Sequence, residues 1–183
     1  MLTPSVMIPL GTKSPDFDLP CVDGNNYTLN SFDDKKVLVV MFICNHCPYV
    51  VHIKDELIKL FEDYKDSDVA FVGISSNDAE YEPTDGFEYM KEEGYPFPYL
   101  YDETQEIAKA YKAACTPDIY LFNKDKELVY RGQLDDSRPG NNKPVTGIDL
   151  RNAIDAVLAG TPVDDNQKPS SGCNIKWKPG NQP

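Results

Sequence analysis

Basic residues are scarce in this sequence. Its 183 residues include 18 Lys and Arg against 30 Asp and Glu, which gives a formal net charge of −12 at pH 7. A charge of this sign opposes the phosphate backbone of nucleic acids and the anionic surface of a membrane. We therefore expect neither nucleic acid nor membrane as a partner.

The sequence also lacks long hydrophobic runs. The longest, Val37 to Cys44, is well short of the 18 or more apolar residues that a membrane-spanning helix needs. The opening MLTPSVMIPLGTKSPDF has no basic run ahead of its apolar residues and is interrupted by Pro4 and Pro9. We expect a cytoplasmic protein.

Cofactor motifs are missing as well, and the five cysteines are an odd number that a purely structural set of disulfides would not use. No Gly-rich phosphate loop, catalytic triad or flavin fingerprint appears. These features predict a protein without a cofactor, in which some thiols are reactive or bind a metal.

The length suits one domain. We predict that residues 1–160 form it and that residues 161–183, rich in Pro, Asp, Gln, Ser and Gly, form an extended tail that packs on it. Trp177, the only tryptophan, is expected to anchor this tail to the core.

Hydrophobic periodicity predicts an α/β fold, because helices separate buried strands. Alternating apolar residues around Asp23-Gly24 predict a β-hairpin over residues 16–29. The expected strands are 37–43, 69–74, 119–122 and 128–130, and the expected helices are 50–64, 86–93, 104–114 and 150–158.

Cys44 and Cys47 form a CxxC motif between the strand 37–43 and the following helix, whose first turn accommodates Pro48. At such a junction unpaired backbone N–H groups and the positive end of the helix dipole favour a thiolate. We predict that Cys44 attacks a disulfide and that Cys47 resolves the mixed disulfide, with protein or small-molecule thiols and disulfides as substrates and an external reductant.

His46 lies inside this motif and is assigned a catalytic role. A protonated imidazole beside Cys44 would stabilise its thiolate. Lowering a thiol pKa by two units stabilises the reduced form by about 2.7 kcal/mol, or about 60 mV for a two-electron couple. His46 is therefore expected to tune the redox potential more than the rate.

Several segments together resemble the peroxiredoxin-like, thioredoxin-family proteins of the alkyl hydroperoxide reductase/thiol-specific antioxidant superfamily. The resemblance covers about residues 10–181 and rests on SPDFDLPCVDGNNYTL, CNHCPYV, CTPDIYLF, YRGQLDDSRP and GCNIKWKPGN. It implies a thioredoxin fold of three α/β/α layers around a mixed sheet, with an N-terminal β-hairpin extension. It also implies that Cys44 and Cys47 are the redox pair, that Pro117 is a cis-proline beside them, and that the backbone of Thr116 binds an extended substrate.

One departure separates the sequence from true peroxiredoxins, whose peroxidatic cysteine follows a P-x-x-x-T/S-x-x-C pattern. Met41 and Val37 stand at the corresponding positions before Cys44, and neither matches. A thiol peroxidase with antioxidant activity is therefore the alternative function. Two others remain open: a zinc or copper site formed by Cys44, Cys47, His46 and His52, and a redox-silent binding module on the same fold.

The remaining cysteines are assigned by position. Cys115 stands two residues before Pro117 and is either a packed apolar residue or an auxiliary thiol. Cys173, in the tail, is either an auxiliary resolving thiol or is buried where Trp177 docks. Cys21, on the apolar face of the hairpin, is expected in the core.

Overall fold

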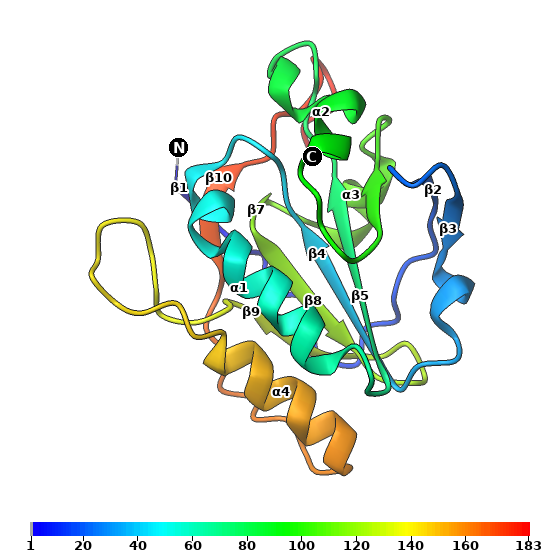
Figure 1. Cartoon of the computed structure of the whole chain (residues 1–183), viewed down its shortest axis with the longest axis vertical. Coiled ribbons are helices and arrows are strands. Elements are labelled where there is room, and N and C mark those ends of the chain that lie inside the picture. The colour runs from blue at the N-terminus through cyan, green and yellow to red at the C-terminus, as the bar shows by residue number, and fades with distance from the viewer. Residues whose placement is uncertain (1) are drawn as a thin grey trace.

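The computed structural model describes residues 2–183 and is built on a five-stranded sheet (Figure 1). Its strand order is β6-β5-β4-β8-β9, with β4 parallel to β5 and antiparallel to β8. The sheet is therefore mixed, as expected. Its strands are β4 (Val37–Phe42), β5 (Val69–Ser75), β6 (Tyr99–Tyr101), β8 (Asp118–Phe122) and β9 (Leu128–Gly132).

The central strand β4 is buried along its whole length because both of its faces are covered. Val37, Val39 and Met41 belong to one apolar cluster, whereas Leu38, Val40 and Phe42 belong to another. This explains the continuous run of apolar residues in the sequence, since successive side chains of a strand point to opposite faces of the sheet.

Helices form the two outer layers. The first apolar cluster includes residues of α1 (Pro48–Tyr64), α2 (Phe87–Glu92) and α4 (Ile148–Ala159), and in Figure 1 α1 and α4 lie in front of the sheet. The second cluster includes residues of α3 (Glu106–Tyr111). All four predicted helices are present, but α3 is shorter than expected because Lys112 adopts a left-handed conformation that ends it.

The predicted hairpin consists of β2 (Asp18–Pro20) and β3 (Asn26–Thr28), followed by the 3-10 helix η1 (Leu29–Phe32). It is a separate two-stranded sheet. Cys21 is buried and forms a β-bridge with Leu100, the middle residue of β6, so the prediction that Cys21 lies in the core is confirmed.

A third sheet joins both ends of the chain, in the order β1-β10-β7. Its strands are β1 (Leu2–Pro4), β7 (Cys115–Thr116) and β10 (Ser171–Asn174). The strand β10 thus lies between β1 and β7 and is not simply extended chain. Further along, Trp177 packs against the second apolar cluster, as predicted.

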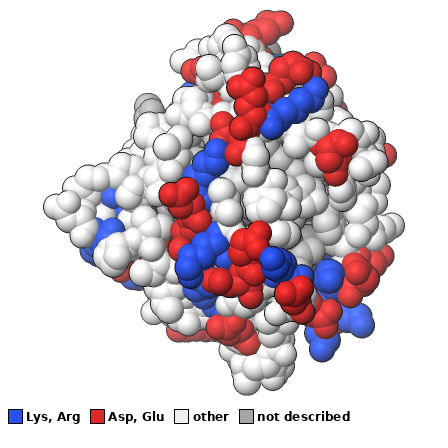
Figure 2. Space-filling view, viewed as in Figure 1, with Lys and Arg blue, Asp and Glu red and all other residues white. Residues whose placement is uncertain are grey.

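Charged side chains of both signs are interleaved on the face of the molecule that carries α1 and α4 (Figure 2). Arg151 of α4 binds Glu56 and Asp63 of α1, and so ties the two helices together across this face. Within residues 2–183 no helix is long and apolar enough to cross a bilayer.

Candidate functional site

The two cysteines of the CxxC motif lie where the central strand passes into the first long helix. Cys44 follows β4 by two residues, and Cys47 is the N-cap of α1, with Pro48 at its first position. Pro48 therefore removes no hydrogen bond. Both cysteines are reduced and almost fully buried, with 1% of Cys44 and none of Cys47 exposed.

The segment that contains Thr116 and Pro117 lies directly against this pair. The peptide bond between them is cis. The sulfur of Cys44 lies 3.4 Å from the hydroxyl of Thr116, and the sulfur of Cys47 lies 3.3 Å from the Thr116 carbonyl oxygen. The structure therefore brings together four of the five residues that the sequence analysis assigned to catalysis and substrate binding, and His46 is the fifth.

The backbone of Thr116 has a pairing partner within the chain, while its expected role in substrate binding stays a prediction. Residue Cys173 of β10 pairs with Thr116 in antiparallel register, and Asn174 pairs with Cys115. The chain's own C-terminal strand thus occupies this edge of β7, which the resemblance assigned to an extended substrate. The sequence around Thr116 did not predict this strand pairing, because Thr116 and Cys173 are far apart in the sequence.

Asp85, at the end of the 3-10 helix η2 (Pro83–Asp85), holds the loop of the motif and was not predicted. Its Oδ1 accepts hydrogen bonds from the backbone N–H groups of Asn45 and His46, at 2.7 and 3.1 Å. Its Oδ2 lies 2.5 Å from Nδ1 of His46 and accepts a 2.8 Å hydrogen bond from Asn77. Because the carboxylate is fully buried, these four interactions fix the conformation of the loop.

The His46 ring is oriented by this carboxylate rather than by the thiol. Its Nδ1 lies 3.9 Å from the sulfur of Cys44, a longer and weaker interaction than its contact with Asp85. His46 is therefore beside Cys44, as expected, but its ring nitrogen lies closer to Asp85. Asp85 lies about 40 residues after the CxxC motif in the sequence, and no sequence pattern connects the two.

The two thiols share one proton. Their mutual hydrogen bond lowers the pKa of Cys47 to about 4 and raises the pKa of Cys44 well above its usual range, an increase to which burial and the negative charge of Asp85 add. The expectation of a lowered Cys44 pKa considered only the helix dipole and His46. In the structure the two thiols titrate as a pair. The first proton is lost easily, and the second is lost with difficulty.

A second buried carboxylate, Asp118, follows Pro117 directly. Its Oδ2 accepts hydrogen bonds from the backbone of Ala114 and the hydroxyl of Tyr120, whereas Oδ1 is buried with no partner among the described residues. Burial raises the pKa of Asp118 to about 7.

The four residues that the sequence offered as a metal site are not together. His52, one turn inside α1, points to Ser137, with 2.6 Å between Nε2 and the hydroxyl. The donor atoms of Cys44, His46 and Asp85 do lie within 4.8 Å of one another. However, both oxygens of Asp85 already accept two hydrogen bonds each, so this carboxylate is satisfied without a cation.

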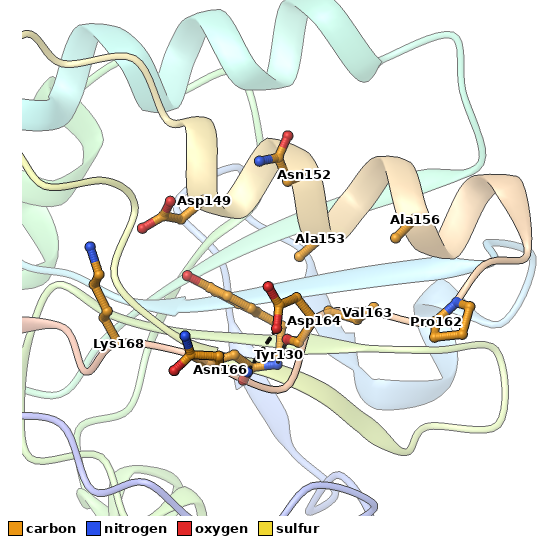
Figure 3. A pocket seen from close by; sticks show the side chains of 11 residues that line it. Tyr130, Asp149, Asn152, Ala153, Ala156, Pro162, Val163, Asp164, Asn166 and Lys168 are labelled. Carbon is orange, nitrogen blue, oxygen red and sulfur yellow. Dashed lines mark hydrogen bonds between the residues drawn. The ribbon is translucent and has the colours of Figure 1, made fainter.

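Cavities of ligand size lie elsewhere. One of about 280 Å³ is enclosed by α4 and the segment 162–168, with Tyr130 at its base and no cysteine in its lining (Figure 3). The hollow beside Pro117, between Tyr49 and Arg138, measures only about 10 Å³, room for roughly one water molecule. The sulfurs of Cys44 and Cys47 are buried and line neither of these two cavities.

This combination of features defines a class. A CxxC pair at the start of a helix, against a cis-proline segment and on a mixed α/β sheet, is the arrangement of a thioredoxin-fold oxidoreductase. The family model described as Redoxin matches residues 9–148, and the chain belongs to the Redoxin family.

Two solved structures are similar to nearly the whole chain. A crystal structure of a conserved protein from Geobacillus kaustophilus is 57% identical, with a TM-score of 0.95 over 98% of this chain and 97% of that one. A protein from Sinorhizobium meliloti is 52% identical, with a TM-score of 0.96 over 97% of this chain and all of that one.

More distant relatives carry redox names. "Putative peroxiredoxin Rv2521" of Mycobacterium tuberculosis is 26% identical over 65% of this chain and 73% of its own length. A structure described as a thiol:disulfide interchange protein from Chlorobium tepidum is 18% identical, with a TM-score of 0.67 over 82% of this chain and 99% of that one. The second likeness shows the fold alone and confirms the predicted thioredoxin fold.

Proposed function

We propose that this protein is a thiol-disulfide oxidoreductase that alternates between a Cys44-Cys47 dithiol and a Cys44-Cys47 disulfide. The observation that carries the proposal is the position of two buried thiols at the N-terminus of α1, both in contact with Thr116 of the cis Thr116-Pro117 segment. The hydrogen bond between the thiols also lowers the pKa of Cys47 to about 4. Such a pair supplies one thiolate near neutral pH and keeps the second thiol next to it for resolution.

Cys44 is the attacking residue in this proposal. Cys47 is covered by the Thr116 carbonyl and by β10, whereas Cys44 is next to His46, whose side chain is 23% exposed. An incoming disulfide therefore reaches Cys44 past the imidazole. For Cys44 to attack, the shared proton must lie on Cys47, and the hydroxyl of Thr116 and Nδ1 of His46 are the groups within reach of the Cys44 thiolate.

The reaction then follows two exchanges. The Cys44 thiolate attacks one sulfur of the substrate disulfide, forms a mixed disulfide and releases the other sulfur as a thiolate. Cys47 loses its proton and attacks the sulfur of Cys44, which releases the second substrate thiolate and leaves the Cys44-Cys47 disulfide. An external dithiol or two thiol molecules return the pair to the reduced state by the reverse steps.

The occupied edge of β7 bears on the substrate class. Since β10 pairs with Thr116, an extended polypeptide cannot pair with that edge of β7 unless β10 moves away. This favours small-molecule disulfides and flexible, exposed cysteines of proteins over substrates that bind as an added strand. Thr116 would then contribute its hydroxyl more than its backbone.

The test is to trap the mixed disulfide. Cys47→Ser, incubated with oxidised glutathione and mapped by peptide mass spectrometry, should carry glutathione on Cys44, because the resolving thiol is gone. Cys44→Ser is the matched control and should carry none on Cys47, which is covered. If both variants leave Cys44 and Cys47 unmodified while wild type also remains reduced, the proposal is wrong.

A thiol peroxidase is the second candidate, favoured by the hydroxyl of Thr116 at 3.4 Å from Cys44 and by the name of the mycobacterial relative. The Cys44 thiolate would attack the O–O bond of a peroxide and become a sulfenic acid, with water or an alcohol released. Cys47 would condense with it to the disulfide and release water. Cys47→Ser treated with hydrogen peroxide should then hold a sulfenic acid on Cys44.

A further inference from the structure

The C-terminal strand β10 approaches the site more closely than ordinary strand packing allows. A Cβ atom on Gly172 would lie 1.9 Å from the carbonyl oxygen of Thr116, so only glycine fits there. The neighbouring Cys173 is thereby held opposite Thr116 in the antiparallel register. The close approach positions a third cysteine at the edge of the CxxC site.

The register also fixes which way this cysteine faces. Residues directly opposite each other in an antiparallel pair place their side chains on the same face of the sheet. The hydroxyl of Thr116 faces the sulfur of Cys44, so the Cys173 side chain lies on the face that carries the redox pair. Cys173 accordingly packs with the apolar cluster that includes Cys44 and Cys47.

Cys115 provides the contrast. It precedes Thr116 in the strand, so its side chain points to the opposite face, where its sulfur lies 3.6 Å from the carbonyl oxygen of Pro117. It is fully buried, and burial raises the pKa of its thiol far above the usual range. Of the two auxiliary thiols that the sequence offered, only Cys173 is placed to react with the pair.

The thiols of Cys47 and Cys173 shift each other's pKa in opposite directions. The S–H of Cys173 is one of the hydrogen-bond donors that lower the pKa of Cys47, and burial and this interaction raise the pKa of Cys173 to about 11. The two residues differ in access, because Cys47 is fully buried whereas Cys173 is half-buried. A disulfide moved from Cys44 to Cys173 would thus lie nearer the surface.

We propose that Cys173 is a third redox thiol, which takes over the disulfide of the CxxC pair and carries it to the C-terminal strand. In this step the Cys173 thiolate attacks the sulfur of Cys47 in the Cys44-Cys47 disulfide. The Cys47-Cys173 bond forms, the Cys44-Cys47 bond breaks, and Cys44 leaves as a thiolate that takes up the proton lost by Cys173. One disulfide replaces another, so no oxidant or reductant is consumed.

The proposal rests on the proposed oxidoreductase function and adds two consequences to it. The exchange frees the Cys44 thiol for a second substrate while the disulfide is kept between Cys47 and Cys173. It also exposes the half-buried sulfur of Cys173 to an external reductant. Burial raises the pKa of the Cys173 thiol and keeps it mostly protonated at neutral pH, so the exchange should accelerate as the pH rises from 7 to 9.

The experiment uses the full chain with Cys44→Ser, oxidised with glutathione disulfide and digested with trypsin under non-reducing conditions. Cys47 lies in the peptide 37–54 and Cys173 in the peptide 152–176, because trypsin does not cut between Lys168 and Pro169. We expect these two peptides to be linked in Cys44→Ser. The double variant Cys44→Ser/Cys173→Ser should give no link, and Cys44→Ser/Cys115→Ser should give the same link as Cys44→Ser.

Wild type gives an independent reading that does not depend on the folding of a variant. After oxidation, part of it should carry the link between 37–54 and 152–176, with Cys44 free to be alkylated, and this part should increase with pH. If wild type forms only the disulfide within 37–54 and Cys44→Ser forms no link, the third-thiol proposal is overturned while the CxxC function stands. If wild type forms neither disulfide, both proposals fail.

Discussion

The carboxylate of Asp85 binds the His46 ring and the backbone N–H of the same residue, one with each oxygen. This double contact joins the loop of the CxxC motif to the end of η2. It also puts a buried negative charge beside the redox pair, where that charge contributes to the raised pKa of Cys44. Asp85 therefore opposes thiolate formation at Cys44 while it holds the loop that positions the thiol.

Asp85→Asn separates these two effects. Removing the charge should lower the pKa of Cys44, and iodoacetamide should alkylate it about threefold faster or more at pH 7, as expected for the loss of a unit charge within 5 Å. The measurement is the alkylation rate of peptide 37–54 by mass spectrometry. Asp135→Asn, which changes a buried carboxylate that caps residues 146–147, is the control and should leave the rate unchanged.

Cys44→Ala should raise the pKa of Cys47. The S–H of Cys44 is the largest cause of the lowered value, and alanine cannot donate a hydrogen bond. Thiolate absorbance at 240 nm, followed from pH 3 to 10, should show an acidic transition in wild type that moves toward the ordinary range in the variant. Cys173→Ala should move it in the same direction by less, and an unchanged transition in Cys44→Ala would contradict the shared proton.

Gly172→Ala should destabilise the protein by about 3 kcal/mol, because its Cβ would overlap the Thr116 carbonyl and push β10 away from β7. The free energy of unfolding in urea measures this. The same variant should form less of the Cys47-Cys173 link, since the two sulfurs move apart.

Gly180→Ala is the matched control. A Cβ there meets no atom within 4 Å, and the only cost is that of a left-handed backbone at φ +80°, about 1 kcal/mol. It should leave the link intact. Equal destabilisation by the two substitutions would show that the close approach of β10 is not what requires glycine at position 172.

Asp118 should make stability depend on pH with a definite sign. Its pKa is about 7 in the folded protein against 3.8 when unperturbed, so the folded state keeps the proton between these values while the unfolded state loses it. Stability therefore falls as pH rises from about 4 to 7. Asp118→Asn cannot ionise and should be more stable than wild type by about 2 to 4 kcal/mol at pH 8, and equal to it near pH 3.5.

Asp136 provides a control of opposite sign. It is exposed, and hydrogen bonds from Gln133 and Lys168 lower its pKa to about 2. Asp136→Asn should therefore lose stability relative to wild type above pH 4. Thermal unfolding at several pH values measures both variants, and the same trend in both would contradict the assignment to Asp118.

Much of the site follows from the sequence because its central part is local. Cys44, His46, Cys47 and Pro48 are consecutive or nearly so, and the periodicity on either side places them between a buried strand and a helix. The resemblance then added Thr116 and Pro117. No local pattern shows which buried polar groups lie together when they are far apart in the sequence, so Asp85 was missed. For the same reason the lowered pKa was assigned to Cys44 alone and not to the pair of thiols.

The fold shows the same limit. Strands with long apolar runs and helices with clear periodicity were predicted, whereas β1, β6, β7 and β10 were not. These strands have two to four residues, too few to show a pattern, and three of them exist only because distant segments pair with one another. The tail was predicted to be extended, but its pairing with Thr116 depends on Gly172, whose role appears only in three dimensions.

The most direct test of the central claim is a redox titration of wild type over a series of glutathione ratios, with rapid alkylation and mass spectrometry of peptide 37–54. We predict a reversible, two-electron transition in which Cys44 and Cys47 lose and regain alkylation together. If both cysteines remain alkylatable at every ratio, or are protected by a bound metal instead, the protein is not a CxxC oxidoreductase.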